Sequence, residues 1–316
     1  MAGSRITVFP NRFPADALAV IGKEFSLGLL KQVVDQSEDV LQQLLSHLQA
    51  AEFIYEQPAF PEPEYTFKHA LTQEVAYNSL LMERRRSLHE RAARAIEALF
   101  HSRLDDHYSE LAHHYSRSGN TQKAVDYLQL AGQQAVQRSA NVEAISHLTT
   151  ALELLNTLPD TPERAQQELA LQIALGAPLQ ATKGWAAPEM GKAYTRAQEL
   201  CQQLGETPQL FMALWGLCQF HIVRAEYKTG RELAEQLLSL AQRQQSSAFF
   251  VQAHLVLGLT LVFLGEFVSA REHFEQGIAL YNPQQHRSHT FLYGYDPKGG
   301  FLYFVAWTLS YLGYPD

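Results

Sequence analysis

YTFKHALTQEVAY, at residues 65–77, is the point where the hydrophobic pattern of this chain changes. Tyr65 and Phe67 alternate with polar neighbours, as side chains along a strand do. Leu71 and Val75 instead have the spacing of one face of a helix, and a histidine lies between the two patterns. We therefore expect a small strand-containing segment to end here and helices to follow as far as the chain extends.

Residues 14–80 are predicted to form three short helices and then a hairpin, after an unstructured lead-in at 1–13. The expected helices lie at 15–21, after Ser26 and after Ser37, and the expected strands at 53–55 and 65–67. Prolines at 58, 61 and 63 keep the connection between the strands out of a helix. Three helices and a hairpin with a projecting loop are the layout of a winged-helix domain.

Composition and charge limit the classes of function. Hydrophobic residues make up 46% of the 316 residues and charged residues 18%, as is typical of a globular chain. The 25 Lys and Arg against 33 Asp and Glu give a formal charge of −8, which disfavours a general nucleic-acid-binding protein. Cys201 and Cys218 have neither metal-ligand nor disulfide spacing, which suits a reducing compartment. No uncharged apolar run has the length of a membrane span, so we expect a cytoplasmic protein without a membrane partner.

The winged-helix layout leaves DNA binding open as an alternative function. The helix after Ser37 carries Glu38, Asp39 and several glutamines but no Lys or Arg, and the loop at 56–64 is acidic. Phosphate contacts, which supply most DNA affinity, need cations. A DNA-binding regulator is therefore the least favoured of the functions considered.

AVIGKEF at 19–25 and FKHALTQEVAY at 67–77 together resemble the region that follows the ATPase domain in bacterial signalling ATPases of the STAND class. This group includes predicted ATPases of the adenylate/guanylate cyclase-associated AAA type, and the resemblance covers residues 14–316. It implies a non-catalytic fragment of a longer protein, with a winged-helix domain followed by a tetratricopeptide-like array. The resemblance also implies an ATPase domain, and in some members a nucleotide cyclase domain, elsewhere in the full-length protein.

The resemblance implies a specific role for His69, which matches a histidine in a Phe-x-His context that reaches the phosphates of bound ADP. An imidazole at a helix start can donate a hydrogen bond to phosphate, as can the N–H groups of the first turn. The alternative is a buried histidine that caps the helix or staples the hairpin to it. The chain contains no Gly-x-x-x-x-Gly-Lys-Ser/Thr loop. ATP or ADP is therefore expected only in the full-length protein, and no cofactor in this chain.

Residues 81–105 are predicted to contain a charged connecting helix. Arg84, Arg85 and Arg86 begin a basic cluster that alternates with glutamates, while Leu88 and Ile96 belong to the stripe expected to be buried. The cluster is either a solvated face with i,i+4 ion pairs or a contact surface for an acidic partner domain.

Residues 106–316 are predicted to be helical repeats that resemble tetratricopeptide repeats and are truncated at the C-terminus. Related turns begin at 225 (AEY), 265 (GEF) and 313, and small residues such as Gly258 and Gly277 are expected to lie against large ones such as Phe274. The turns lie 40 and 48 residues apart, more than the usual spacing of about 34. Linkers are expected at 156–162, 181–188 and 282–300.

Such an array leaves a concave face on which a protein or a small effector can bind. Aromatic residues are frequent after Trp215. Most are expected in the core, and a minority could line a groove. Tyr227, Phe267 and Trp307 are the candidates for partner contact in this region.

No catalytic or metal-binding constellation is found in the sequence. His113 and His114 point about 100° apart on a helix and cannot share a ligand face, and Glu110 with His114 supplies only two ligands. We expect no enzymatic activity of this chain. Three functions remain: a regulatory region whose winged helix contacts an ATPase domain, a free-standing repeat scaffold, and a winged-helix DNA regulator.

Overall fold

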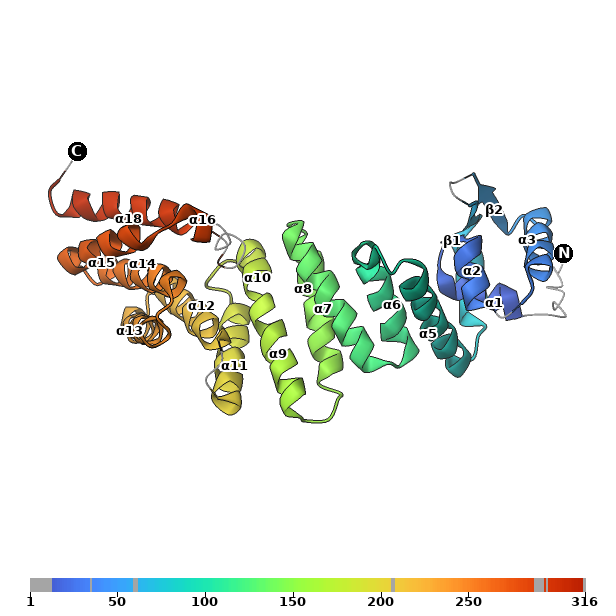
Figure 1. Ribbon diagram of the computed structural model, residues 1–316, viewed down its shortest axis with the longest axis horizontal. Helices are drawn as coiled ribbons and strands as arrows, with labels where there is room; N and C mark the ends of the chain where they lie inside the picture. The colour runs from blue at the N-terminus through green and yellow to red at the C-terminus, as the bar shows by residue number, and fades with distance from the viewer. Residues whose placement is uncertain are drawn as a thin grey trace, which may run out of the picture. The chain divides into compact units, whose positions relative to one another are not determined.

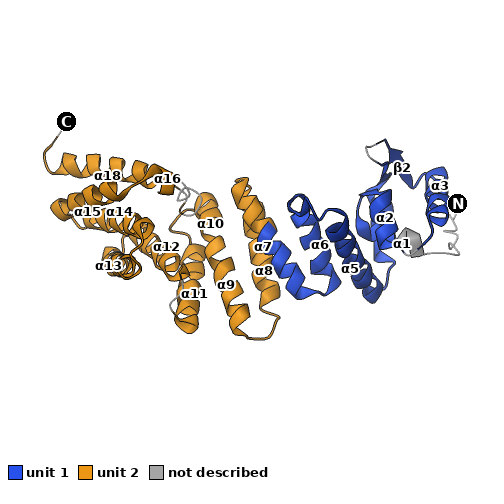
Figure 2. Cartoon of the chain, in the orientation of Figure 1, with its two compact units in different colours: residues 1–130 blue, residues 131–316 orange. Residues whose placement is uncertain are grey.

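The computed structural model describes residues 13–34, 36–58, 62–205, 208–286, 293 and 295–314. The described part is mainly α-helical with a small sheet near its start, which confirms the predicted fold class (Figure 1). Internal contacts divide the chain into unit 1, Met1–Leu130, and unit 2, Ala131–Asp316, as Figure 2 shows. The division falls inside a helix, and the domain boundaries expected at residues 80 and 105 stay predictions.

Unit 1 begins with three helices and a sheet, and continues with longer helices. The elements are α1 (Phe13–Ile21), β1 (Glu24–Ser26), α2 (Leu27–Val33), α3 (Glu38–Ala50), β2 (Ile54–Gln57), β3 (Glu64–Phe67), α4 (Ala70–Asn78), α5 (Met82–Leu99), a 3-10 turn (Leu104–His107), α6 (Tyr108–Ser118) and α7 (Thr121–Gln137), which crosses the division. The predicted helices and hairpin are therefore present. At the start of α2, Ser26 Oγ accepts a hydrogen bond from the Leu29 amide at 3.2 Å.

The sheet has the strand order β1-β3-β2, with both pairs antiparallel. Phe25 of β1 pairs with Tyr65 of β3, and their rings stack with centroids 5.8 Å apart. Strand β1 was not expected, because three residues are too few to show an alternating pattern. The sheet fixes the end of β3, and α4 begins three residues after Phe67.

The described part of unit 2 consists of helices that pack against their neighbours along the chain. The elements are α8 (Asn141–Leu155), α9 (Pro162–Ala174), α10 (Gly176–Lys183), α11 (Pro188–Leu204), α12 (Gln209–Val223), α13 (Tyr227–Gln244), α14 (Ser247–Phe263), α15 (Phe267–Leu280), α16 (Pro283–His286) and α18 (Pro297–Tyr311). The linker expected at 156–162 is present, ending where α9 begins. The linker expected at 181–188 is wrong in its first residues, because α10 continues to Lys183. The one at 282–300 holds α16 and the start of α18, and part of it lies outside the described residues.

Glycines allow close approach between neighbouring helices of unit 2. A Cβ atom added to Gly258 of α14 would overlap the ring of Phe274 of α15, and one added to Gly277 would overlap the ring of Phe301 of α18. Both phenylalanines are fully buried. The expected pairing of small with large residues between helices is thus present.

The three related turns share one backbone feature. Ala225, Gly265 and Gly313 have φ values of 62°, 81° and 87°, in the left-handed region. A glycine takes this conformation without strain, whereas an alanine pays a steric cost. The first of the three turns therefore carries backbone strain that the other two lack.

Candidate functional site

His69 occupies the N-cap position of α4, with extended backbone angles (φ −131°, ψ 129°). Its side chain is exposed and makes no capping hydrogen bond, while its carbonyl oxygen accepts from the Thr72 amide at 3.0 Å. The alternative of a buried, capping histidine is therefore wrong. The imidazole is accessible to a group outside the chain, and its contact with a nucleotide phosphate stays a prediction.

Helix α4 is unusual in unit 1 because it buries none of its residues. Leu71 and Val75 lie one turn apart on it, with 68% and 55% of their surfaces exposed. We call these two side chains the α4 patch. Leu81 and Met82, which follow the helix, are also exposed. Exposed apolar side chains on the helix that His69 begins are the kind of surface that a second domain or chain covers.

A chain of hydrogen bonds joins four elements of unit 1 through two buried imidazoles. Tyr77 Oη of α4 lies 3.0 Å from His89 Nε2 of α5, and His89 Nδ1 lies 2.9 Å from His114 Nδ1 of α6. His114 also bonds to the backbone of Ile21, at the end of α1. One arrangement of protons satisfies all three contacts. His114 donates from Nε2 to Ile21 and accepts at Nδ1, and His89 donates from Nδ1 and accepts at Nε2 from the tyrosine.

The imidazoles of His89 and His114 in this chain of hydrogen bonds are both neutral near pH 7. Burial, reinforced by His114, His113 and nearby arginines, lowers the pKa of His89 to about 3. Burial, reinforced by His113 and Arg117, also lowers the pKa of His114 to about 3. Among the described residues, no cluster of three or more His, Cys, Asp or Glu side chains has the arrangement of a metal site. Tyr77, His89 and His114 thus form a structural connection between helices.

The structure separates the three arginines predicted as partner contacts. Arg85 Nε donates to the Leu80 carbonyl at 3.1 Å, and its guanidinium lies 4.9 Å from the centre of the Tyr77 ring. Arg84 is half-buried and Arg86 is exposed. The three side chains therefore do not form one exposed patch, and their role as partner contacts stays a prediction.

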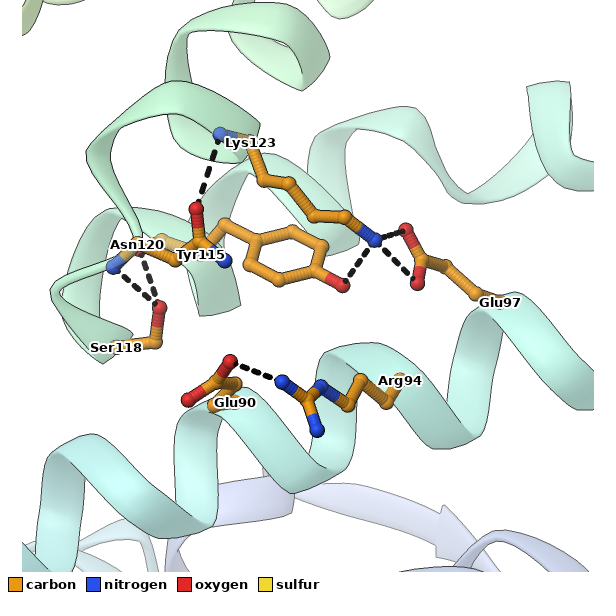
Figure 3. Close-up of polar contacts among 7 residues, drawn as sticks. All are labelled: Glu90, Arg94, Glu97, Tyr115, Ser118, Asn120 and Lys123. Atoms are coloured by element: carbon orange, nitrogen blue, oxygen red, sulfur yellow. Dashed lines mark hydrogen bonds and ion pairs between the residues drawn. The ribbon is translucent and has the colours of Figure 1, made fainter.

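Farther along α5, charged side chains pair within unit 1, as Figure 3 shows. Arg94 binds Glu90 one turn away at 2.7 Å, and Lys123 Nζ of α7 contacts both carboxylate oxygens of Glu97 at 2.7 and 2.8 Å. Burial alone would raise the pKa of Glu97, but hydrogen bonds from Lys123 and two tyrosines hold it below its ordinary value. In this part of α5 the charged side chains form ion pairs within unit 1, as expected for a solvated face and not for a surface that contacts an acidic partner.

In unit 2 the three predicted aromatic candidates belong to one connected row of rings. Tyr227 stacks on Phe263, with centroids 5.2 Å apart, and Phe263 meets Trp307 edge-on at 6.0 Å. Trp307 lies 5.8 Å from Tyr311, which stacks on Phe267 at 4.8 Å. We call these five side chains the aromatic row. Phe263 and Tyr311 are 40% and 57% exposed, and the other three are half-buried.

The aromatic row arises because successive repeats place aromatic residues at equivalent positions. Tyr227 begins α13 and Phe267 begins α15, and each stacks on a ring at the end of the first helix of the next repeat. The two stacks are close to parallel, with interplanar angles of 3° and 10°. The row therefore has a structural role at the repeat junctions in addition to any contact with a partner.

An arginine supports each of these junctions. Arg231 of α13 forms an ion pair with Glu266 in the next turn at 2.8 Å. The equivalent Arg271 of α15 lies over the ring of Tyr314, 5.9 Å from its centre. The same arginine position thus serves two kinds of contact, a carboxylate in one junction and an aromatic face in the next.

The sequence interpretation missed the imidazole chain. It considered His113 and His114 only as metal ligands and did not consider His89, which lies 25 residues before His114. The available signal was a histidine at a position in the apolar stripe of the connecting helix, one residue after Leu88. Its partner could not be identified, because the faces of α5 and α6 that meet depend on tertiary packing.

Comparison with known proteins gives distant matches. No family model matches the chain. An uncharacterized protein of Rhizobium meliloti (strain 1021) is 25% identical over 288 residues, which are 90% of this chain and 28% of that protein. The chain therefore spans little more than a quarter of the length of this relative.

Among solved structures, a Signal Transduction ATPase with Numerous Domains (STAND) protein with a tetratricopeptide repeat sensor from Pyrococcus horikoshii matches with a TM-score of 0.46 and 11% identity. The match covers 95% of this chain and 54% of that chain. In this chain, none of the helices among the described residues combines the length and apolarity required to cross a membrane.

Proposed function

We propose that this chain is the non-catalytic regulatory and interaction region of a STAND-type signalling ATPase. In this proposal residues 14–80 are a winged-helix domain that contacts a nucleotide-binding domain, and His69 donates a hydrogen bond to the phosphates of bound ADP. The helical repeats of unit 2 bind a protein or small effector. Effector binding then changes the balance between a closed and an open arrangement of the longer protein.

The observation that carries this proposal is the state of His69 and of the helix that it begins. The imidazole is exposed at a helix N-terminus, where a phosphate also meets the free N–H groups of the first turn. The α4 patch, Leu71 and Val75, is uncovered on the same helix. A polar anchor beside an uncovered apolar surface suits a domain that closes over a bound nucleotide.

The order of elements gives further support for the winged-helix interpretation. Three helices, a first short strand between α1 and α2, and a hairpin after α3 form a three-stranded antiparallel sheet. The outward face of α3 carries Glu38, Asp39 and Gln42, with no Lys or Arg along the helix. This charge pattern favours a protein-facing role over binding to DNA.

The first test is the coding sequence on both sides of this chain, followed by a nucleotide assay on the longer product. A phosphate-binding ATPase domain in frame is expected. His69→Ala in that protein should weaken ADP retention by about tenfold or more, since a hydrogen bond to a charged group contributes about 1.5–3 kcal/mol. It should also raise basal signalling.

His101→Ala is the matched control, because His101 is another exposed histidine of unit 1, bonded only to a local carbonyl at 3.3 Å among the described residues. Equal ADP retention in the wild type and the His69 variant would count against the proposal. So would the absence of any ATPase domain, in which case the repeat scaffold becomes the better description.

The aromatic row supports a partner-binding surface on unit 2, whether the chain is part of a signalling ATPase or a repeat scaffold. Tyr303, 65% exposed, extends the row by lying 6.2 Å from Trp307. Aromatic side chains of this kind are enriched at protein interfaces. A photo-crosslinking residue at position 303 should capture one discrete partner, whereas the same residue at Tyr55, 48% exposed in unit 1, should not. Identical capture at both positions would exclude the row as the contact surface.

A further inference from the structure

A cavity of about 400 Å³ opens on unit 1 between the end of α1 and helices α4, α5 and α6. This volume is in the range of pockets that bind small molecules, roughly 300–1,000 Å³. The predicted contact residues His69 and Arg84–Arg86 do not line it. The cavity therefore shares helix α4 with the surface assigned to the nucleotide-binding domain but is lined by other residues.

One wall of the cavity is the buried imidazole chain. His89 lines the cavity, but both of its ring nitrogens are already bonded, to Tyr77 and to His114. Tyr77 is held in turn by the Arg85 guanidinium over its ring. Because these side chains fix one another, this wall is preorganised and does not need to be ordered by a ligand.

Hydrogen-bond donors with spare capacity are among the residues that line the cavity. Arg117 Nη1 contacts His113 Nδ1 at 3.1 Å, so that His113 accepts there and carries its proton on Nε2. Lys23 lies on the same lining, and among the described residues neither Lys23 nor Arg117 has a carboxylate within ion-pair distance. Two cations and an imidazole N–H are thus available to an acid group.

Acceptors line the same cavity from α4. Gln73 Nε2 donates to the Ala19 carbonyl at 3.2 Å, which leaves its amide oxygen as an acceptor. Glu74, one residue further, is exposed and has no ion-pair partner among the described residues. The cavity therefore presents a carboxylate and two unpaired cations that do not neutralise one another.

We propose that this cavity binds a small zwitterionic molecule of the amino-acid class. Its acid group lies at Lys23 and Arg117, its ammonium group at Glu74 and the Gln73 oxygen, and its side chain against Val20. A ligand with both charges can contact both sets of groups, whereas a simple anion can contact only Lys23 and Arg117. The proposal does not rest on the function proposed above, and its test needs only this chain.

The test is a calorimetric titration of the 316-residue chain with each of the twenty free amino acids and with inorganic phosphate. At least one amino acid is expected to bind, with phosphate weaker. Arg117→Gln and Glu74→Gln should each weaken that binding by tenfold or more. Arg103→Gln and Glu83→Gln are the matched controls, since both residues are exposed in unit 1 and outside the cavity, and they should leave the affinity unchanged.

Three results would overturn the proposal. The first is no binding of any amino acid at millimolar concentration. The second is binding of phosphate alone that Glu74→Gln does not alter, which would make the site one for simple anions. The third is amino-acid binding that survives both cavity variants, which would locate the ligand elsewhere. None of these results affects ADP retention by the longer protein, so the two proposals can fail separately.

Discussion

Unit 1 and unit 2 are both built from packed helices, but different contacts hold their interiors together. Unit 1 joins α1, α4, α5 and α6 through the Tyr77–His89–His114 chain, whose members must share protons in one direction. In unit 2 the contacts of α14, α15 and α18 include glycines that face phenylalanines, as at Gly258 and Phe274. Among its described residues, unit 2 also has one contact between two imidazoles, His254 and His273, at 3.0 Å.

The difference teaches that the two units are sensitive to different disturbances. Directional bonds between buried titratable groups fail when one member gains a proton. Close-packed rings and glycines are indifferent to protons but sensitive to added volume. Four changes test this contrast, taken from the largest expected effect to the smallest.

Lowering the pH from 7 to 5 should destabilise unit 1 more than unit 2. An unfolded histidine gains its proton near pH 6.5, whereas His89 and His114 in the folded chain stay neutral down to about pH 3. The unfolded state therefore binds more protons below pH 6.5, and stability falls as the pH falls. The loss by pH 5 is about 2 kcal/mol for each imidazole, or about 4 kcal/mol in unit 1.

In unit 2 burial, reinforced by His273, lowers the pKa of His254 to about 4, so this histidine contributes a loss of about 2 kcal/mol over the same range. Burial also lowers the pKa values of His273 and His286 in unit 2 and of His113 in unit 1, so these histidines add to the losses in their own units. Hydrogen exchange measured by mass spectrometry, and corrected for the intrinsic exchange rate at each pH, reports the stability of both units in one sample. Equal losses in the two units, or no loss in unit 1, would contradict the contrast.

Gly258→Ala should destabilise unit 2 by about 2 kcal/mol. The new methyl group overlaps the buried Phe274 ring, and overpacking of this kind costs about 1–3 kcal/mol even when helix propensity improves. Gly299→Ala is the control, since nothing lies within 4 Å of a Cβ atom at that position of α18. Urea denaturation should show the control to be neutral or slightly stabilised, and identical behaviour of the two variants would show the contact to be unimportant.

Tyr77→Phe should cost about 1 kcal/mol of stability in unit 1. The ring under Arg85 is kept, but the buried Nε2 atom of His89 loses its partner. Tyr311→Phe in unit 2 keeps its stack on Phe267 and should stay within about 0.5 kcal/mol of the wild type. Thermal denaturation of the two variants compares them directly, and an unchanged Tyr77 variant would argue against the hydrogen bond.

The smallest effects concern the turns of unit 2, and they have opposite signs. Ala225→Gly should stabilise by up to about 1 kcal/mol, because the alanine holds a left-handed conformation at φ 62°. Gly265→Ala at the equivalent turn, with φ 81°, should destabilise by about 1 kcal/mol or slightly more. Midpoints of urea unfolding measure both changes, and the same sign for both would show that the turns are not equivalent.

Much of the fold could be predicted because it depends on local patterns. The helices after Ser26 and Ser37, the hairpin, and the turns at 225 and 265 follow from apolar spacing, capping residues and small turn residues. The site was predicted less completely. The exposure of His69 and the connection of Tyr227, Phe267 and Trp307 into one row required the packed structure.

Local pattern alone therefore established a mainly helical chain, its repeat turns and a histidine at the start of α4. The residue at a single position does not say which face of its helix will pack against which face of another helix. His89 and His114 meet between α5 and α6, and Lys23 and Arg117 line the same cavity, because the helices pack at particular angles and rotations. Contacts between residues distant in the chain are properties of that packing, and the proton-sharing chain and the cavity beside it emerge only there.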